Sequence, residues 1–210
     1  EGRSFATSQT TQLMAGSTEE DDRTILDLSQ ALYRVYHLKR VYYTAFHYTQ
    51  DARGYEEEHL QKVVTPYWRM ARLYQADRLI QLYGFTPDEI TPESQPNLQQ
   101  DMDPKTAWAL RHLDQFPVEV NKADYEILIR VPGIGIANAK KIIEARKYCT
   151  VTHDVLRKMR ISLKRCVYFI TCNGQYRGGN LLFSPDLRSY LAGPPEQLSI
   201  TASLVAGGCG

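Results

Sequence analysis

The fold is decided by residues 120–146, which read VNKADYEILIRVPGIGIANAKKIIEAR. Asn121 is suited to cap a first helix, because its side chain accepts a hydrogen bond from a free amide of the first turn. The inner side of this helix is apolar and consists of Ile127, Leu128 and Val131. Pro132 ends the helix, and a second helix follows. The stretch therefore predicts two helices joined by a tight turn over residues 121–147.

Two glycines allow a turn that is too tight for side chains and leave bare amides at the start of the second helix. The helix dipole favours an anion at the same place, and a nucleic-acid phosphate is the natural ligand. The predicted DNA-binding residues are therefore Gly133, Ile134, Gly135, Ile136, Ala137, Lys140 and Lys141. Glycines in an ordinary corner between two helices would give the same turn without a ligand, so the turn alone leaves that alternative open.

The whole stretch resembles the helix-hairpin-helix motif of DNA repair and recombination proteins, including its Asn-x-Ala start and its VPGIG turn. The resemblance implies that the amides of the hairpin bind the phosphate backbone. Some members of this family also bind a monovalent cation through main-chain carbonyls, and the matching positions here are Ile129, Val131 and Ile134. Small residues in the second helix, Ala137 and Ala139, are expected to let the two helices pack closely.

A second, degenerate hairpin is predicted directly after the first. Thr152 is suited to cap a helix that runs to Met159, residues 160–162 form a turn, and residues 163–171 form the partner helix. This unit lacks the glycines, so we expect it to pack against the first hairpin. More generally, the pattern from Phe116 to about residue 171 predicts helices throughout.

Charge is distributed unevenly along the chain, although the formal net charge is only +1. Residues 86–127 contain nine acidic and three basic residues, whereas residues 136–177 contain ten basic and two acidic residues. A local basic block is typical of a protein that binds a polyanion. A solvated basic surface without a partner would have the same composition.

Composition and spacing exclude several other classes of protein. The mixture of apolar and charged residues is that of an ordinary globular protein, and no apolar run is long enough to cross a membrane. With no signal peptide at the first residues, we expect a cytoplasmic protein. The spacing of the four cysteines fits neither a zinc ribbon nor an iron–sulfur site, so we expect reduced thiols at Cys149, Cys166, Cys172 and Cys209.

The N-terminal part of the chain predicts a strand, a helix and a second strand. Residues 10–15 are β-prone, residues 18–36 carry apolar side chains at helical spacing behind a cap at Ser17 or Thr18, and residues 39–46 are rich in β-branched and aromatic residues. This spacing is typical of a βαβ unit, whose two strands are parallel.

A polar loop at residues 50–58 separates this unit from a second long helix. Thr65 is suited to cap this helix and Pro66 to occupy its first turn. Residues 86–104 contain four prolines and are expected to form an irregular connection, followed by a short helix at about residues 104–113.

Six ordered blocks over about residues 7–173 are similar to the C-terminal half of a family of radical SAM proteins for DNA modification or repair: SQTTQLMAGSTEEDDRTIL, LKRVYYTAFHY, RLYQADRLIQLYGF, DMDPKTAWAL, FPVEVNKADYEILIRVPGIG and LKRCVYFITCNG. The resemblance implies a partial TIM-type barrel whose cofactor side is lined by Thr11, Gln12, Thr44 and Phe46. It also implies an S-adenosylmethionine cofactor and a [4Fe–4S] iron–sulfur cluster in the full-length protein, and a partner resembling uracil-DNA glycosylase. The CxxxCxxC loop that holds the cluster in this family is absent from these residues.

The predicted fold class is therefore α+β and mostly helical. We expect four segments: a βαβ portion of a radical SAM-type barrel at 1–64, a connecting helix and Pro-rich loop at 65–103, a double helix-hairpin-helix DNA-binding domain at 104–173, and a loosely ordered tail at 174–210.

Three functions remain open at this level. The first is the DNA-holding region of a radical SAM enzyme, without catalytic activity by itself. The second is a stand-alone DNA-binding or partner-docking module that is not an enzyme. The third is a DNA glycosylase of the helix-hairpin-helix class, whose catalytic aspartate would be Asp154, 19 residues after Gly135. Lyase-active glycosylases carry a lysine just after the hairpin, where this chain has Ala137.

Overall fold

The computed structural model describes residues 8–47, 65–182 and 184–192. The predicted polar loop at residues 50–58 and Cys209 lie outside the described residues, as do residues 183 and 193–210 of the predicted tail. The described part contains helices and short strands, which confirms the predicted mixed α+β class.

The chain divides into two compact units. Among the described residues, the N-terminal unit contains residues 8–47, 65–80 and 85–100. The C-terminal unit contains residues 81–84, 101–182 and 184–192.

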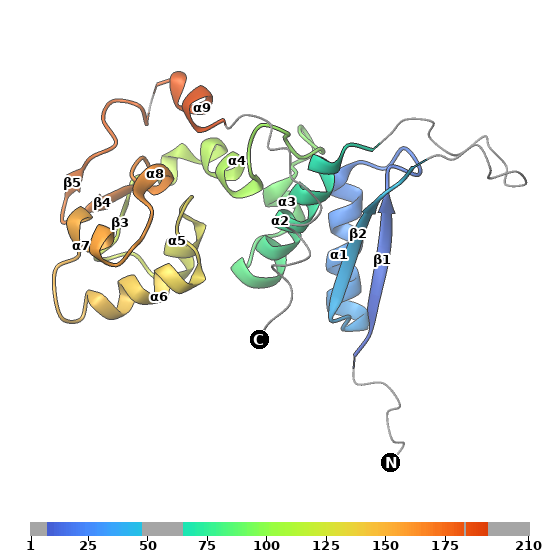
Figure 1. Cartoon of the computed structure of the whole chain (residues 1–210), viewed down its shortest axis with the longest axis horizontal. Coiled ribbons are helices and arrows are strands. Elements are labelled where there is room, and N and C mark those ends of the chain that lie inside the picture. The colour runs from blue at the N-terminus through green and yellow to red at the C-terminus, as the bar shows by residue number, and fades with distance from the viewer. Residues whose placement is uncertain (1–7, 48–64, 183, 193–210) are drawn as a thin grey trace, which may run out of the picture. The chain divides into compact units, whose positions relative to one another are not determined.

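The N-terminal unit begins with the predicted βαβ arrangement (Figure 1). Strand β1 (Thr10–Ala15) leads into helix α1 (Asp22–Tyr36), and strand β2 (Arg40–Ala45) follows. The two strands pair in parallel, with Thr10 opposite Arg40. Both predicted strands and their parallel pairing are therefore confirmed.

The two faces of this sheet differ in exposure, because successive side chains of a strand point to opposite faces. Val41 and Tyr43 are buried, and the Tyr43 hydroxyl donates to Ser29 of α1 at 2.9 Å. On the opposite face, Met14 is 51% and Tyr42 is 42% exposed. Among the described residues this sheet has two strands and no closed barrel is formed.

Helix α1 begins at Asp22 rather than at residue 18. Asp21 is its N-cap, and the carboxylate accepts a hydrogen bond from the Thr24 amide at 2.8 Å. The predicted caps Ser17 and Thr18 are wrong, because the residues after β1 form a turn instead. In that turn, Glu20 accepts hydrogen bonds from the amide of Gly16 at 2.7 Å and from the amide of Thr18 at 3.1 Å.

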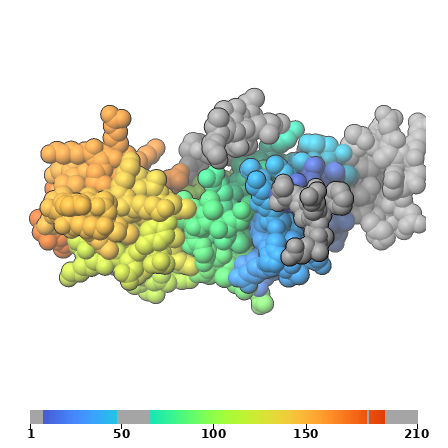
Figure 2. Space-filling model, turned by 90° about the horizontal axis from the view of Figure 1, so that it is seen from below, coloured from blue at the N-terminus to red at the C-terminus, as the bar shows by residue number. Residues whose placement is uncertain are grey.

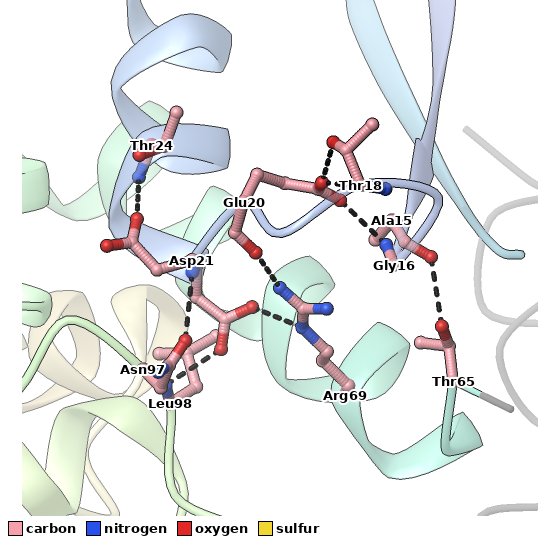
Figure 3. A network of polar contacts seen from close by, with 11 residues as sticks. Ala15, Gly16, Thr18, Glu20, Asp21, Thr24, Thr65, Arg69, Asn97 and Leu98 are labelled. Atoms are coloured by element: carbon pink, nitrogen blue, oxygen red, sulfur yellow. Dashed lines mark hydrogen bonds and ion pairs between the residues drawn. The ribbon is translucent and has the colours of Figure 1, made fainter. Parts of the chain in front are cut away.

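A partly buried ion pair joins the start of α1 to the second long helix (Figure 3). The Asp22 side chain is 1% exposed, and Oδ1 lies 2.6 Å from Nε of Arg69. Its other oxygen accepts the Leu98 amide at 2.8 Å, and the Asp22 amide donates to Asn97 at 3.2 Å. Arg69 also donates to the Glu20 carbonyl at 2.9 Å. The loop after β1, α2 and the Pro-rich segment are thereby tied together.

Helix α2 (Tyr67–Tyr83) starts one residue after Pro66. Thr65, the predicted cap, donates its hydroxyl to the carbonyl of Ala15 at 3.2 Å. Gly16 is required beside it, since its φ is +82° and a Cβ there would lie 1.9 Å from Oγ1 of Thr65. The Pro-rich connection contains one short helix, α3 (Pro87–Ile90).

The C-terminal unit is built from short elements (Figure 1). In chain order these are α4 (Pro104–Arg111), a 3₁₀ turn at Leu113–Gln115, β3 (Val118–Glu119), α5 (Tyr125–Arg130), α6 (Ile136–Ala145), α7 (His153–Lys158), α8 (Leu163–Cys166), β4 (Ile170–Cys172), β5 (Gln175–Tyr176) and α9 (Asp186–Leu191).

A small sheet interrupts the predicted helical run from Phe116 to residue 171, so that prediction is wrong at both ends. β3 pairs in parallel with β4, and β4 pairs antiparallel with β5. The Glu119 carboxylate holds the β4–β5 turn by accepting the amides of Asn173 at 3.0 Å and Gly174 at 2.8 Å. Partial burial raises the pKa of Glu119, but these bonds and those from Asn121 outweigh it and lower the pKa to about 2.

Candidate nucleic-acid interface

Helices α5 and α6 form the predicted hairpin, and the turn between them contains both glycines. Gly133 has a φ of +84°, the left-handed region that glycine adopts without strain. Gly135 is the N-cap of α6, with φ −93° and ψ 173°. None of the described side chains caps this helix. The first amides of α6 therefore have no partner in the helix itself and remain suited to bind an anion.

The entry to the hairpin differs from the prediction at Asn121. Helix α5 begins at Tyr125 with Asp124 as its N-cap, so Asn121 does not cap it. Instead, the Asn121 amide group pairs with the backbone of Val151: Oδ1 accepts its N–H at 2.8 Å and Nδ2 donates to its C=O at 3.0 Å. Arg146 donates to the Ala123 carbonyl at 2.6 Å. These contacts fix the ends of the hairpin to each other.

The packing of the hairpin leaves one side of α6 free. Ala139 and Ile142 are fully buried, as are Ile134 in the turn and Leu128 in α5. Lys140 and Lys141 of α6 are exposed. Helices α5 and α6 contribute to the yellow surface of the C-terminal unit in Figure 2. Ala139 fills the predicted role of a small packing residue. Ala137 does not, because it is exposed at the start of α6.

The two glycines of the turn have different surroundings. A Cβ on Gly133 would lie 3.2 Å from the backbone nitrogen of Cys166 in α8, closer than real side chains normally approach. A Cβ on Gly135 would meet only the Tyr83 hydroxyl, at 3.5 Å, which is ordinary contact. A side chain at Gly133 would therefore disturb the turn, since the turn packs against α8.

The second hairpin is present in shortened form. Helix α7 is capped by Thr152 as predicted, with the hydroxyl accepting the Val155 amide at 3.3 Å. Arg160 takes a φ of +60°, the role that Gly133 has in the first hairpin, and the buried Ile161 follows it. The predicted partner helix ends at Cys166, because the next residues continue to strand β4. The contact of α8 with Gly133 confirms that the two hairpins pack together.

The cations of the basic block fall into two groups. Several are held by protein groups: Arg165 by Asp103 at 2.8 Å, Lys147 by Glu144 at 2.7 Å, and Arg177 by Asp154 at 3.5 Å. Five others are exposed and form no ion pair with the described residues: Lys140, Lys141, Lys158, Arg160 and Lys164. Lys140 and Lys141 lie in α6 of the first hairpin, and Lys158, Arg160 and Lys164 lie in and next to the turn of the second hairpin.

One residue of this region was missed in the sequence. Lys105 lies in the first turn of α4 and donates its ammonium group to the carbonyl of Ile134 at 2.6 Å. Nζ also lies 4.9 Å from the ring centroid of Tyr83. Burial lowers the pKa of Lys105 to about 7, while the Asp103 carboxylate acts in the opposite direction. A signal was present, since a lysine in the first turn of a helix opposes the dipole and needs another partner.

The predicted cation ligands lie in the hairpin turn, and two of their carbonyls have protein partners. The Ile134 carbonyl accepts Lys105, and the Val131 carbonyl accepts the Ile134 amide at 3.1 Å. Ile129 is buried in α5. No cluster of three acidic, histidine or cysteine side chains suited to a metal occurs in the part of the chain that the structure describes.

The predicted cofactor-binding residues lie in the N-terminal unit and do not share one face. Gln12 and Thr44 lie on the open face of the sheet, where Nε2 of Gln12 donates to the Thr44 hydroxyl at 3.0 Å. Thr11 points to the opposite face by the alternation of the strand. Phe46 follows β2, and its amide donates to the Ala15 carbonyl at 3.0 Å.

Asp154 has the environment of a residue that stabilises a helix start. It occupies the first turn of α7, where the dipole favours an acid. Its carboxylate is 61% exposed and lies 3.6 Å from Arg157 and 3.5 Å from Arg177. This position gives the glycosylase alternative no support.

Comparison with known proteins identifies one element of the chain. Residues 114–152 match the family model of the helix-hairpin-helix motif. No curated protein and no solved structure matches the chain. None of the described helices combines the length and the hydrophobicity that crossing a membrane requires. The chain therefore contains a helix-hairpin-helix motif, an element that in general binds nucleic acid.

Proposed function

We propose that the chain binds the phosphate backbone of DNA through the hairpin of α5 and α6. The observation that carries this proposal is the N-terminus of α6, where Gly135 leaves the first amides without a side-chain cap. A phosphate oxygen bound there accepts hydrogen bonds from these amides and lies at the positive end of the helix dipole. The contacting residues are Gly133, Ile134, Gly135, Ile136, Ala137, Lys140 and Lys141.

The exposed cations extend this contact along the DNA. Lys140 and Lys141 follow the amides in α6, and Lys158, Arg160 and Lys164 surround the turn of the second hairpin. Backbone amides and lysines read phosphates and not bases, so binding is nearly independent of sequence. Each neutralised phosphate releases counterions, so affinity falls steeply as salt increases.

Within the full-length protein, we propose that this region holds DNA for a radical SAM enzyme of DNA modification or repair. The similarity of six ordered blocks supports this, as does the parallel βαβ unit with Gln12 and Thr44 on an open face. The [4Fe–4S] cluster and S-adenosylmethionine would be held elsewhere, since the described cysteines Cys149, Cys166 and Cys172 form no ligand cluster. A protein resembling uracil-DNA glycosylase is the partner that the same similarity suggests.

The alternative is a DNA-binding or partner-docking module without catalytic function. The gene itself distinguishes the two, because the enzyme requires a CxxxCxxC sequence upstream of these residues. A gene without that sequence would contradict the enzyme proposal and leave the DNA-binding proposal intact.

A salt titration tests DNA binding directly. The affinity for single- and double-stranded DNA of unrelated sequences is measured by fluorescence anisotropy at increasing salt concentrations. We expect similar affinities for different sequences and a steep linear fall of log Kobs with log salt. A flat salt response, or strong preference for one sequence, would contradict phosphate binding by the hairpin.

A further inference from the structure

The ammonium group of Lys105 is bound inside the hairpin rather than directed to solvent. Nζ donates to the Ile134 carbonyl at 2.6 Å and faces the ring of Tyr83 at 4.9 Å from its centroid. The Ile134 side chain is fully buried and anchors the turn between α5 and α6. The Ile134 carbonyl therefore belongs to a fixed part of the backbone. Lys105 therefore acts on the backbone that presents the anion-binding amides.

Two groups near this carbonyl attract a cation, whereas burial itself disfavours the charged form of Lys105. The aromatic face of Tyr83 attracts positive charge, and the carboxylate of Asp103 lies two residues before Lys105. Asp103 also pairs with Arg165 of α8 at 2.8 Å. The first turn of α4 thus contacts the first hairpin through Lys105 and the second hairpin through Asp103.

A free monovalent cation does not fit the same position well. The family resemblance places such an ion on the carbonyls of Ile129, Val131 and Ile134. An ion at the Ile134 oxygen would lie close to the ammonium group of Lys105, and two positive charges repel each other strongly in a half-buried site. The Val131 carbonyl accepts the Ile134 amide, which uses one of its two lone pairs.

We propose that Lys105 takes the place of the monovalent cation in this hairpin. An ammonium group carries the same charge as a potassium ion and is likewise bound by carbonyl oxygens. Because the charge is part of the chain, the turn is fixed without an ion from solution. The part of this inference that concerns DNA binding rests on the proposed function of the hairpin. The part that concerns stability, namely that the fold needs no ion from solution, does not.

The first measurement needs no DNA. The Tm is measured in KCl and in tetramethylammonium chloride at equal ionic strength, since the methyl groups of tetramethylammonium prevent coordination by carbonyls. The pH is set to about 6, below the pKa of Lys105, so that the ammonium group is charged. We expect the wild-type protein to have the same Tm in both salts. The Lys105→Met variant should be less stable, and potassium should restore part of its Tm.

The second measurement is the affinity for DNA in the same two salts. Lys105→Met should lose about tenfold in tetramethylammonium chloride, the size of one lost hydrogen bond to a charged group, and should recover in KCl. Lys122→Met removes the same charge from an exposed side chain of the same unit and serves as the matched control. It should show no difference between the two cations. Lys105→Arg keeps the charge and is the variant to measure if Lys105→Met does not fold. Its DNA affinity should be the same in both salts.

The outcomes separate this inference from the proposed function. A wild-type Tm that depends on potassium, or a Lys105→Met variant that responds to the two salts as Lys122→Met does, would overturn the role of Lys105. A wild-type protein that binds no DNA in either salt would overturn the proposed function, while the Tm comparison would still decide the role of Lys105.

Discussion

Gly133 and Gly135 lie two positions apart in one turn but are required for different reasons. Gly133 combines a φ of +84° with the close approach of α8, so its missing side chain serves the fold. Gly135 has an extended conformation that any residue adopts, and it has room for a Cβ. What Gly135 provides is a helix start without a side-chain cap. The structural and the ligand-binding roles of the turn are therefore separable by substitution.

Gly133→Ala is expected to destabilise the C-terminal unit by about 1–3 kcal/mol, from the strained φ and the contact with α8. Urea unfolding of the variant and of Gly135→Ala as a matched control measures this. Gly135→Ala should change the free energy of unfolding much less. Equal effects of the two substitutions would contradict the assignment of the roles.

The lowered pKa of Glu119 predicts that the stability of the C-terminal unit depends on pH. Its pKa falls from the ordinary value of 4.5 to about 2 in the folded protein, so its carboxylate contributes stability above pH 4.5 and loses it as the pH falls to about 2. Glu119→Gln should cost about 1–2 kcal/mol at neutral pH and progressively less in this acid range. Urea midpoints at neutral pH and in the acid range measure the difference, and the exposed Glu126→Gln is the control. A cost of Glu119→Gln that is independent of pH would contradict this account.

At the level of elements, the two hairpins are related by their turns. The turn between α7 and α8 repeats the left-handed residue and the buried isoleucine of the first turn, with Arg160 and Ile161 in place of Gly133 and Ile134. The second hairpin has a four-residue partner helix, α8, and no glycine. We therefore infer that the second hairpin contributes exposed positive charge and packs against the first hairpin. We do not expect its amides to form a second anion site.

Arg160→Gln and Lys164→Gln are each expected to lower the slope of log Kobs against log salt by about one, the effect of one lost phosphate contact. Neither substitution alters a described ion pair, so Tm should stay unchanged. Lys39→Gln, an exposed lysine of the N-terminal unit, is the control with the same loss of charge. An unchanged slope for Arg160→Gln and Lys164→Gln would remove the second hairpin from the proposed interface.

The sequence predicted the elements whose signals are local. The VPGIG turn, the cap at Thr152 and the strand pair around α1 each follow from neighbouring residues. It did not predict β3 and β4, because strands of two and three residues have no periodicity. Their pairing depends on Glu119, which binds backbone amides 54 and 55 residues away. The link from Lys105 to Ile134 spans 29 residues and was missed for the same reason.

At the scale of the whole molecule, each unit has a polar network of its own. The N-terminal unit depends on Asp22, whose buried carboxylate bonds Arg69 and the Leu98 amide. The C-terminal unit depends on Asn121 and Glu119, which join its sheet and its hairpins. Chains with two such units need not unfold in one step.

Asp22→Ala should destabilise the N-terminal unit by about 3 kcal/mol, because it leaves the partly buried guanidinium group of Arg69 and the Leu98 amide without their acceptor. In a Trp68→Phe background, Trp108 of the C-terminal unit is the remaining tryptophan, and its urea transition should not move. DNA affinity should also stay unchanged. Asp27→Ala, with a 53% exposed side chain, is the control. Loss of DNA binding in Asp22→Ala would contradict placement of the interface within the C-terminal unit.

The most direct test of the central claim is the DNA affinity of Gly135→Asp. Aspartate is a favourable N-cap, and the backbone of Gly135 accepts it without strain, so α6 should be as stable as before or more stable. Its carboxylate would accept hydrogen bonds from the first amides of α6 and repel a phosphate. Gly135→Asn supplies a cap without the charge and is the matched control.

Anisotropy titrations at low salt, with Tm measured in parallel, give the result. The account predicts that Gly135→Asp loses at least about tenfold in affinity, since one replaced charge-assisted contact is worth that much, with no loss in Tm. Gly135→Asn should lose less. A Gly135→Asp variant that binds DNA as tightly as the wild-type protein would contradict the claim that the start of α6 holds the phosphate.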